Sequence, residues 1–268
     1  MPSIDRRRFL ALAGAAASAA ASALGCAPGG ARPDAAPLSA ADSSRAHARG
    51  RLTARPPAPT AGPPPGSGME PLGLGSERDG VIYAPPAYRA DRPAPLVVML
   101  HGAGGSARRA LPRLRHLADE HGLLLLAVDS REVTWEAIAN RFEPDTGFID
   151  RAMARVFSRY AVDPARIAVE GFSDGASYAL GLGLTNGDLF THAIAFSPGS
   201  VPLLERHGAP AVFVSHGTAD EILPIDECSR RIVPELRRRS YAVEYVEFDG
   251  PHTVPPAIAE QAVRWLLS

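Results

Sequence analysis

Short apolar runs that alternate with longer helix-like stretches are the feature that most limits what this chain can fold into. From residue 71 onward, runs of Val, Leu and Ile are separated by stretches in which apolar residues recur at helical spacing. Uninterrupted apolar runs are typical of strands buried on both faces. The pattern therefore predicts a mostly parallel, twisted sheet with helices on both faces. The predicted strands are 81–83, 96–100, 123–128, 167–169, 193–196, 211–215 and 243–248, and the predicted helices are 106–120, 147–160, 174–185, 226–239 and 256–267.

A glycine-flanked serine follows one of these strands. In open α/β sheets the functional site forms at the carboxyl ends of the strands. The pentapeptide Gly-Phe-Ser-Asp-Gly at 171–175 comes directly after the strand 167–169 and opens a helical stretch. This G-x-S-x-G pattern is typical of a nucleophile elbow, a sharp turn that leaves no room for side chains beside the serine. The pattern predicts Ser173 as a nucleophile; the alternative is a glycine-rich turn with a surface serine.

A second glycine-rich turn, His-Gly-Ala-Gly-Gly at 101–105, follows the strand 96–100. Such a turn can direct backbone N–H groups into the site and, with the N–H after the nucleophile, form an oxyanion hole. No GxGxxG or GxxxxGK[ST] motif is present, which argues against a phosphate cradle. We interpret His101 as a hydrogen-bonding anchor of the turn rather than a catalyst.

The acid and the base of a triad are predicted from chain order. Asp220 comes just after the strand 211–215, and His252 lies between the last strand and the C-terminal helix. The order Ser173, Asp220, His252 is the one expected for a hydrolase built on an α/β sheet. Taken singly, Asp220 has an alternative role as a turn or helix-capping residue.

Neighbouring residues compete for these two roles. The competing acids lie farther from the strand end than Asp220. The competing histidine leaves its strand too early for the expected topology. The competitors are Glu221, Asp226 and Glu227 for the acid, and His216 for the base.

Together these motifs resemble a known family. The region 76–265 is similar to α/β-hydrolases of the phospholipase/carboxylesterase type and to the extracellular polyhydroxyalkanoate-depolymerase-like esterases, through its segments 100–104, 171–175, 216–220 and 250–252. The resemblance implies Ser173 as nucleophile, His252 as base and Asp220 as the residue that orients it. It also implies oxyanion donors at the backbone N–H groups of Ala103 and Asp174. The side chain of Asp174 receives no role.

The expected activity is that of a serine-dependent carboxylesterase acting through an acyl-enzyme on small or moderate acyl esters. The connection 197–210 is short, which predicts an open site with no large cap domain. Trp135 follows another strand end, and we hypothesise that it lines the substrate pocket; a surface or packing tryptophan is the equal alternative. Two further functions stay open: a serine peptidase or amidase on the same fold, and a catalytically inactive surface lipoprotein that binds ligands.

Composition limits the partners. The formal net charge is −1, which argues against a nucleic-acid binder. The two cysteines, Cys26 and Cys228, and histidines without HxxxH or HExxH spacing give no support for a metal site. We therefore expect a small-molecule ester substrate, no metal and no organic cofactor. We interpret Cys228 as a small buried hydrophobe, and the sequence predicts no oligomeric state.

Residues 1–26 have the pattern of an export signal. Arg6, Arg7 and Arg8 precede a run of small and apolar residues that is too short for a stable membrane span. The arginine pair resembles a twin-arginine signal. The end of the run resembles a lipoprotein cleavage box in which Cys26 is lipidated; the alternative is ordinary cleavage after residue 23.

The domain organisation follows from these segments. More than half of residues 27–70 are Ala, Pro or Gly, which predicts a disordered tether. Residues 71–268 are the predicted catalytic domain. The expected location is outside the cytoplasm of a bacterial cell, either as an envelope lipoprotein or as a periplasmic or extracellular protein. Contact with a membrane is expected only through a lipid at Cys26.

Overall fold

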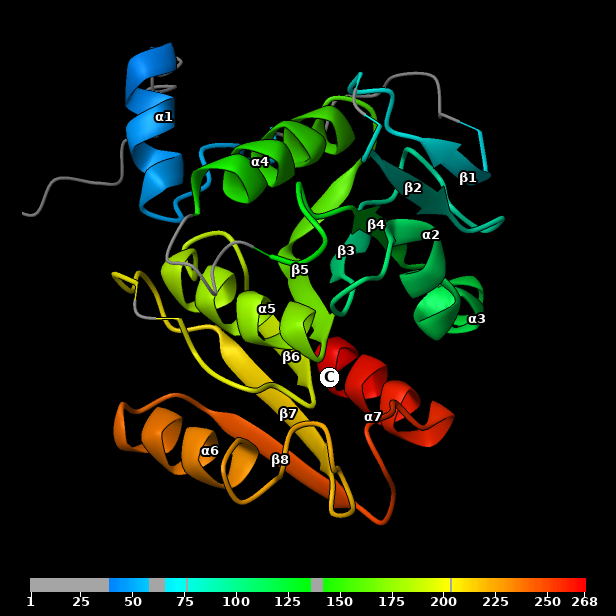
Figure 1. Cartoon of the computed structure of the whole chain (residues 1–268). Helices are drawn as coiled ribbons and strands as arrows, with labels where there is room; N and C mark the ends of the chain where they lie inside the picture. Colours follow the sequence, from blue (N-terminus) through cyan, green and yellow to red (C-terminus); the bar gives the residue numbers. More distant parts are fainter. Residues whose placement is uncertain (1–38, 58–65, 76, 136–141, 203) are drawn as a thin grey trace, which may run out of the picture. The chain divides into compact units, whose positions relative to one another are not determined.

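The computed structural model contains an eight-stranded sheet and describes residues 39–57, 66–75, 77–135, 142–202 and 204–268 (Figure 1). The strand order is β1-β2-β4-β3-β5-β6-β7-β8. β1 pairs antiparallel with β2 and β2 with β4, and all other pairs are parallel. The predicted mostly parallel sheet is confirmed. The strands are β1 (Gly68–Pro71), β2 (Gly80–Ala84), β3 (Ala94–Leu100), β4 (Leu124–Val128), β5 (Val162–Phe172), β6 (His192–Phe196), β7 (Ala211–Gly217) and β8 (Val243–Phe248).

The helices after residue 100 lie close to the predicted ranges, with one division, whereas a further helix at 40–48 was not predicted. The predicted helix 106–120 is two helices, because Pro112 has no backbone N–H and is suited to the first position of a new helix. None of the helices in the described ranges is long and apolar enough to cross a membrane. The helices are α1 (Ala40–Ala48), α2 (Ala107–Ala110), α3 (Pro112–His121), α4 (Glu143–Phe157), α5 (Asp174–Thr185), α6 (Ser229–Arg238) and α7 (Pro256–Leu267).

The central strands are buried on both faces, as their continuous apolar runs predict. In β3, Leu96, Val98 and Leu100 pack with α4 and α5. The alternate residues Val97 and Met99 pack with α2, α3 and α7 on the opposite face. The helix α6 packs with α5 over β6 and β7. The core therefore consists of two apolar layers separated by the sheet, with the helices on both sides (Figure 1).

An N-terminal strap, which we define as α1 with residues 49–57, packs on α4 and on the segment after α5. Asp150 on α4 accepts hydrogen bonds from the backbone N–H groups of Thr53 and Ala54, each at 2.8 Å. The Asp150 carboxylate also pairs with the His47 ring at 2.8 Å. Leu52 is only 2% exposed and joins the core with α4 and α5. These contacts hold the strap at both its helical and its extended part.

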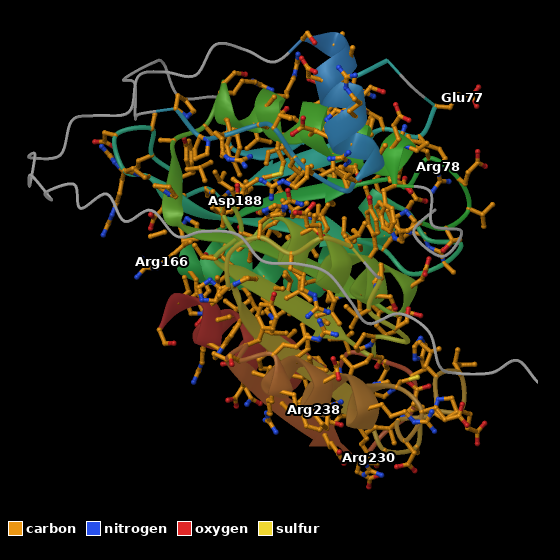
Figure 2. All side chains as sticks on the ribbon, turned by 90° about the vertical axis from the view of Figure 1, so that its left-hand side faces the viewer. Glu77, Arg78, Arg166, Asp188, Arg230 and Arg238 are labelled. Atoms are coloured by element: carbon orange, nitrogen blue, oxygen red, sulfur yellow. The ribbon has the colours of Figure 1, made fainter. Side chains whose placement is uncertain are left out.

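Two residues that follow α5, Asn186 and Asp188, also hold the strap. The side chain of Asn186 accepts from the N–H of Leu52 and donates to the carbonyl of Gly50, both at 2.8 Å. Asp188, labelled in Figure 2, accepts from the guanidinium groups of Arg51 and Arg55. The Arg51 guanidinium holds the pKa of Asp188 far below its usual range.

The prediction of a disordered tether over 27–70 is wrong for the strap and for β1. The compact unit runs from Leu38 to Ser268, so the boundary predicted at residue 71 is also wrong. Composition alone could not show the strap, because its order comes from partners 96 to 137 residues away in the chain. The predicted export signal and the start of the tether lie outside the described residues.

We expect Asp150→Ala to lower the free energy of unfolding by about 2–3 kcal/mol at pH 7, because it leaves half-buried N–H groups of the strap without their acceptor. Burial raises the pKa of Asp150, but the N–H of Ala54 and the other strap donors outweigh it and lower the pKa. The carboxylate therefore stabilises the fold above the ordinary pKa of aspartate, and this contribution is lost as the pH falls through the folded-state pKa.

Urea unfolding of both proteins at several pH values checks this expectation. The difference between wild type and variant should be largest near neutrality and should shrink below about pH 4. Glu244→Ala, which removes an exposed carboxylate on β8, is the matched control. A difference that grows on acidification, or an equal loss in the control, would contradict the role of Asp150.

Candidate active site

Ser173 stands at the sharp turn between β5 and α5. Its backbone has φ 58° and ψ −121°, a conformation that residues other than glycine rarely adopt. A Cβ atom on Gly171 would lie 2.1 Å from the Gly175 carbonyl oxygen, and one on Gly175 would lie 2.4 Å from the His101 carbonyl oxygen. Both glycines of the motif are therefore required by close backbone contact, and the turn presents Ser173 at the carboxyl end of β5.

The structure brings Ser173, His252 and Asp220 together. His252 follows β8, and its Nε2 lies 2.8 Å from the Ser173 Oγ. Its Nδ1 lies 2.6 Å from Oδ2 of Asp220, which follows β7. Three residues from three strand ends thus form one continuous hydrogen-bonded chain.

Asp220 is held as a buried carboxylate. It is 5% exposed, and its Oδ1 accepts from the backbone N–H groups of Ile222 at 3.0 Å and Leu223 at 2.8 Å. Burial acts to raise the pKa of Asp220, but the N–H of Leu223 and the His252 ring outweigh it, so the pKa lies below its usual value. The group facing His252 is therefore an anion at neutral pH.

His216, the competing histidine, contacts the same carboxylate from the other side. Its Nε2 lies 2.8 Å from the Leu223 carbonyl and 3.2 Å from the Asp220 Oδ2. Its Nδ1 lies 2.7 Å from the Ser229 hydroxyl. Burial lowers the pKa of His216, so the ring is neutral and donates from Nε2. His252, and not His216, contacts Ser173. His216 contacts only the Asp220 member of the three and helps to hold its carboxylate in place.

The competing acids are not part of this chain of hydrogen bonds. Glu221, Asp226 and Glu227 are exposed. Asp226 forms an ion pair with Arg230 on α6.

The turn 101–105 passes beside the nucleophile. A Cβ atom on Gly102 would lie 3.4 Å from the Cβ of Ser173. The N–H of Ser173 itself donates to the Phe196 carbonyl and is not available to a ligand. The backbone N–H groups of Ala103 and Asp174, in contrast, donate to no acceptor within the described part of the chain. Asp174 is the first residue of α5, where free N–H groups and the helix dipole favour negative charge.

His101 anchors this turn, as the sequence predicts. The ring is 2% exposed, its Nδ1 lies 2.7 Å from the Gly102 carbonyl, and its Nε2 accepts from the N–H of Ser130 at 3.0 Å. Burial lowers the pKa of His101 and keeps the ring neutral. Gly104 adds a second link, because its N–H donates to the Val133 carbonyl at 2.9 Å.

Trp135 does not line a pocket, and that hypothesis is wrong. Its side chain is 0% exposed and packs between the ring of His101 at 5.0 Å and the ring of Tyr178 at 5.1 Å. The alternative of a packing tryptophan holds. Its indole N–H donates to the His101 carbonyl at 2.7 Å, and its backbone N–H donates to the Asp174 carboxylate at 3.2 Å. Burial raises the pKa of this Asp174 carboxylate.

Sequence reasoning missed an ion pair beneath the nucleophile. Glu170 on β5 is fully buried and pairs with Arg113 on α3. The Arg113 guanidinium also lies 5.6 Å from the centre of the Phe172 ring, which in turn lies 4.7 Å from the His252 ring. Burial raises the pKa of Glu170 even with Arg113 present. The one available signal was a glutamate inside an apolar strand, directly before the elbow.

Among the described residues, no three His, Cys, Asp or Glu side chains are grouped as metal ligands. Cys228 is buried, 6% exposed and not in a disulfide, as its interpretation as a small hydrophobe requires. Cys26 lies outside the described residues.

Comparison with known proteins supports the fold. No protein-family model matches the chain. It is 24% identical over 160 residues to a protein named probable feruloyl esterase C from Aspergillus flavus, an alignment covering 56% of this chain and 58% of the relative. The chain thus spans little more than half the length of the curated relatives it matches.

Solved structures extend the likeness over most of the chain. A fluorophosphonate-binding serine hydrolase of Staphylococcus aureus superposes with a TM-score of 0.61 at 16% identity, over 76% of this chain and 100% of that one. A carboxylesterase from Bacillus cereus superposes with a TM-score of 0.55 at 20% identity, over 72% and 94%. The chain has the α/β-hydrolase fold.

The strained backbone of Ser173 leads to a stability prediction. We expect Ser173→Gly to be about 1 kcal/mol more stable than Ser173→Ala, because only glycine adopts the positive φ without steric cost. Thermal and urea unfolding of the two variants provide the measurement. Ala154→Gly, at an exposed position of α4, should instead lose about 1 kcal/mol. Equal stability of the two Ser173 variants would show that the turn carries no strain.

Proposed function

We propose that the protein is a serine hydrolase that cleaves carboxylic esters. The observation that carries this proposal is the chain Ser173 Oγ, His252 Nε2, His252 Nδ1 and Asp220 Oδ2, with separations of 2.8 and 2.6 Å. A serine hydroxyl is a weak nucleophile at neutral pH and requires a base within hydrogen-bonding reach. A protein that only binds a ligand has no need of this arrangement, which argues against the inactive binding lipoprotein.

The mechanism follows from the contacts. His252 takes the proton of Ser173 as the hydroxyl oxygen attacks the ester carbonyl carbon, and later returns that proton to the leaving alcohol. The Asp220 carboxylate fixes the proton of His252 on Nδ1 and stabilises the imidazolium. Water, activated by the same imidazole, then hydrolyses the acyl-enzyme. These steps use only side chains and backbone of this chain and require no metal or organic cofactor.

Charge on the carbonyl oxygen is stabilised by the N–H groups of Ala103 and Asp174. Asp174 follows Ser173 in sequence, and Ala103 follows Gly102, which packs against Ser173. Neither N–H is used by another acceptor in the described residues. Loss of one such donor raises the barrier by roughly 3–4 kcal/mol in comparable sites.

The substrates are esters of small or moderate acyl groups. The described part of the connection 197–210 between β6 and β7 contains no helix, so no helical cap covers the site from there. The name of the Aspergillus relative supports including hydroxycinnamate esters in this range. The narrower resemblance to polyhydroxyalkanoate-depolymerase-like esterases stays a prediction.

A fluorophosphonate probe together with a panel of chromogenic substrates tests the function. The probe should label wild type and the control Ser158→Ala, an exposed serine after α4, but not Ser173→Ala. Esters from acetyl to decanoyl and methyl ferulate should be cleaved, with kcat/KM falling toward decanoyl. Peptide anilides that react faster than every ester would identify a peptidase instead. A wild type that neither reacts nor is labelled would favour the binding lipoprotein.

We also propose export from the bacterial cytoplasm and lipidation at Cys26. The support is the sequence: paired arginines at 6–7, a short run of small and apolar residues, and Cys26 after Ala-Leu-Gly. The enzyme would then be an envelope lipoprotein whose one contact with the membrane is the lipid.

Growth of a bacterial host with an alkyne-labelled fatty acid checks the lipid. The wild type should carry the label and sediment with membranes, and Cys26→Ser should lose the label. Cys228→Ser is the matched control and should keep it. A wild-type chain whose N-terminus is Leu24, without label, would show ordinary cleavage instead.

A further inference from the structure

Trp135 touches both halves of the proposed oxyanion hole. One half is the turn 101–105, which carries the N–H of Ala103; the other is the start of α5, which carries the N–H of Asp174. The indole N–H donates to the carbonyl of His101, two residues before Ala103, at 2.7 Å. The backbone N–H donates to the carboxylate of Asp174 itself, at 3.2 Å.

The tryptophan ring is fixed from both sides. It stacks on Tyr178 at 5.1 Å with an interplanar angle of 14°, and Tyr178 lies one turn after Asp174 on α5. The ring of His101 covers it at 5.0 Å. The hydroxyl groups of Tyr178 and Thr146 lie 2.9 Å apart, which links the stack to α4. A fully buried ring held in this way cannot contact substrate. It can instead fix the position of the turn 101–105 relative to α5.

The segment that carries Trp135 is tied to the turn along its length. Asp129 accepts from the N–H of Ala107, Ser130 donates to the ring of His101, and Val133 accepts from the N–H of Gly104. Trp135 is the member of this segment that also reaches α5. The distance between the turn and the first residue of α5 therefore depends on Trp135, in addition to the direct approach of Gly175 to the His101 carbonyl.

From this geometry we propose that Trp135 is a positioning residue that sets the separation of the two oxyanion donors, and that Asp174 takes part through its carboxylate as well as its N–H. The inference rests on the proposed function. It also accounts for the half-buried Asp174 carboxylate beside Ser173: this carboxylate is the acceptor that holds the Trp135 backbone.

Trp135→Phe is the direct test, because phenylalanine keeps a stacking ring and loses the indole N–H. Since loss of a whole donor costs about 10²–10³ in kcat, we expect displacement of one donor to lower kcat about 10- to 100-fold. KM for a butyryl ester should change less than about threefold, because the donors act on the charge of the transition state. Trp265→Phe on α7, whose ring packs on His192 and Phe213, is the matched control and should keep kcat within about twofold.

The inhibition constant of an alkyl trifluoromethyl ketone distinguishes a positioning role from a purely structural one, because a purely structural role of Trp135 would leave this constant unchanged. The adduct of this ketone with Ser173 places an oxyanion in the hole. The inhibition constant should therefore rise by the same factor as kcat/KM falls. A Trp135→Phe variant with wild-type kcat overturns the proposal, and so does one whose kcat falls while the inhibition constant stays unchanged.

A second pair of variants decides the matter if Trp135→Phe does not fold. Asp174→Asn keeps an oxygen that accepts from the Trp135 N–H and should lose clearly less of its kcat than Asp174→Ala. Asp174→Ala removes the acceptor and should lose about tenfold or more. Equal activity of the two variants overturns the proposal. A wild type inactive toward all esters and unlabelled by fluorophosphonate would overturn the proposed function and this inference together, whereas an active wild type separates them.

Discussion

The close approach of backbone at the turn between β5 and α5 is the constraint on which the site depends. The missing side chains of Gly171 and Gly175 allow the chain to reverse within one residue and to lie against the carbonyl of His101. That contact brings the turn 101–105 beside Ser173. The positive φ of Ser173 costs conformational free energy. The pairing of β5 with β3 and β6 stabilises the turn enough to maintain this conformation. The same backbone contact thus positions the proposed nucleophile and the turn that carries a proposed oxyanion donor.

The two buried carboxylates near the site, Asp220 and Glu170, have different kinds of partners. Asp220 accepts two backbone N–H groups and contacts two imidazoles, so that it stays ionised next to His252. Glu170, in contrast, has one cationic partner, Arg113, and burial dominates its pKa. The first arrangement orients a base. The second fixes α3 against β5 and places a cation over Phe172, whose ring packs on His252.

Most of the sheet, and the residues that meet at the site, could be predicted from the sequence, because local pattern and chain order carry that information. Continuous apolar runs locate β3, β4 and β6, and the position of each candidate after its own strand brings Ser173, Asp220 and His252 to one edge. Trp135 could not be placed, since a residue after a strand end may face a pocket or the core, and only its contacts with His101 and Tyr178 decide. The order of the strap depends on Asp150 and Asn186, which composition does not reveal.

If Cys26 carries the proposed lipid, the docked strap shortens the distance that the folded domain can reach from the membrane. A free chain from Cys26 to residue 70 could span at most about 150 Å, whereas the chain from Cys26 to Ser39, where the described part of the strap begins, can span at most about 45 Å. A lipid on Cys26 would therefore confine catalysis to a thin shell above the bilayer. Esters in that shell would be accessible, and those deeper in a cell wall would not.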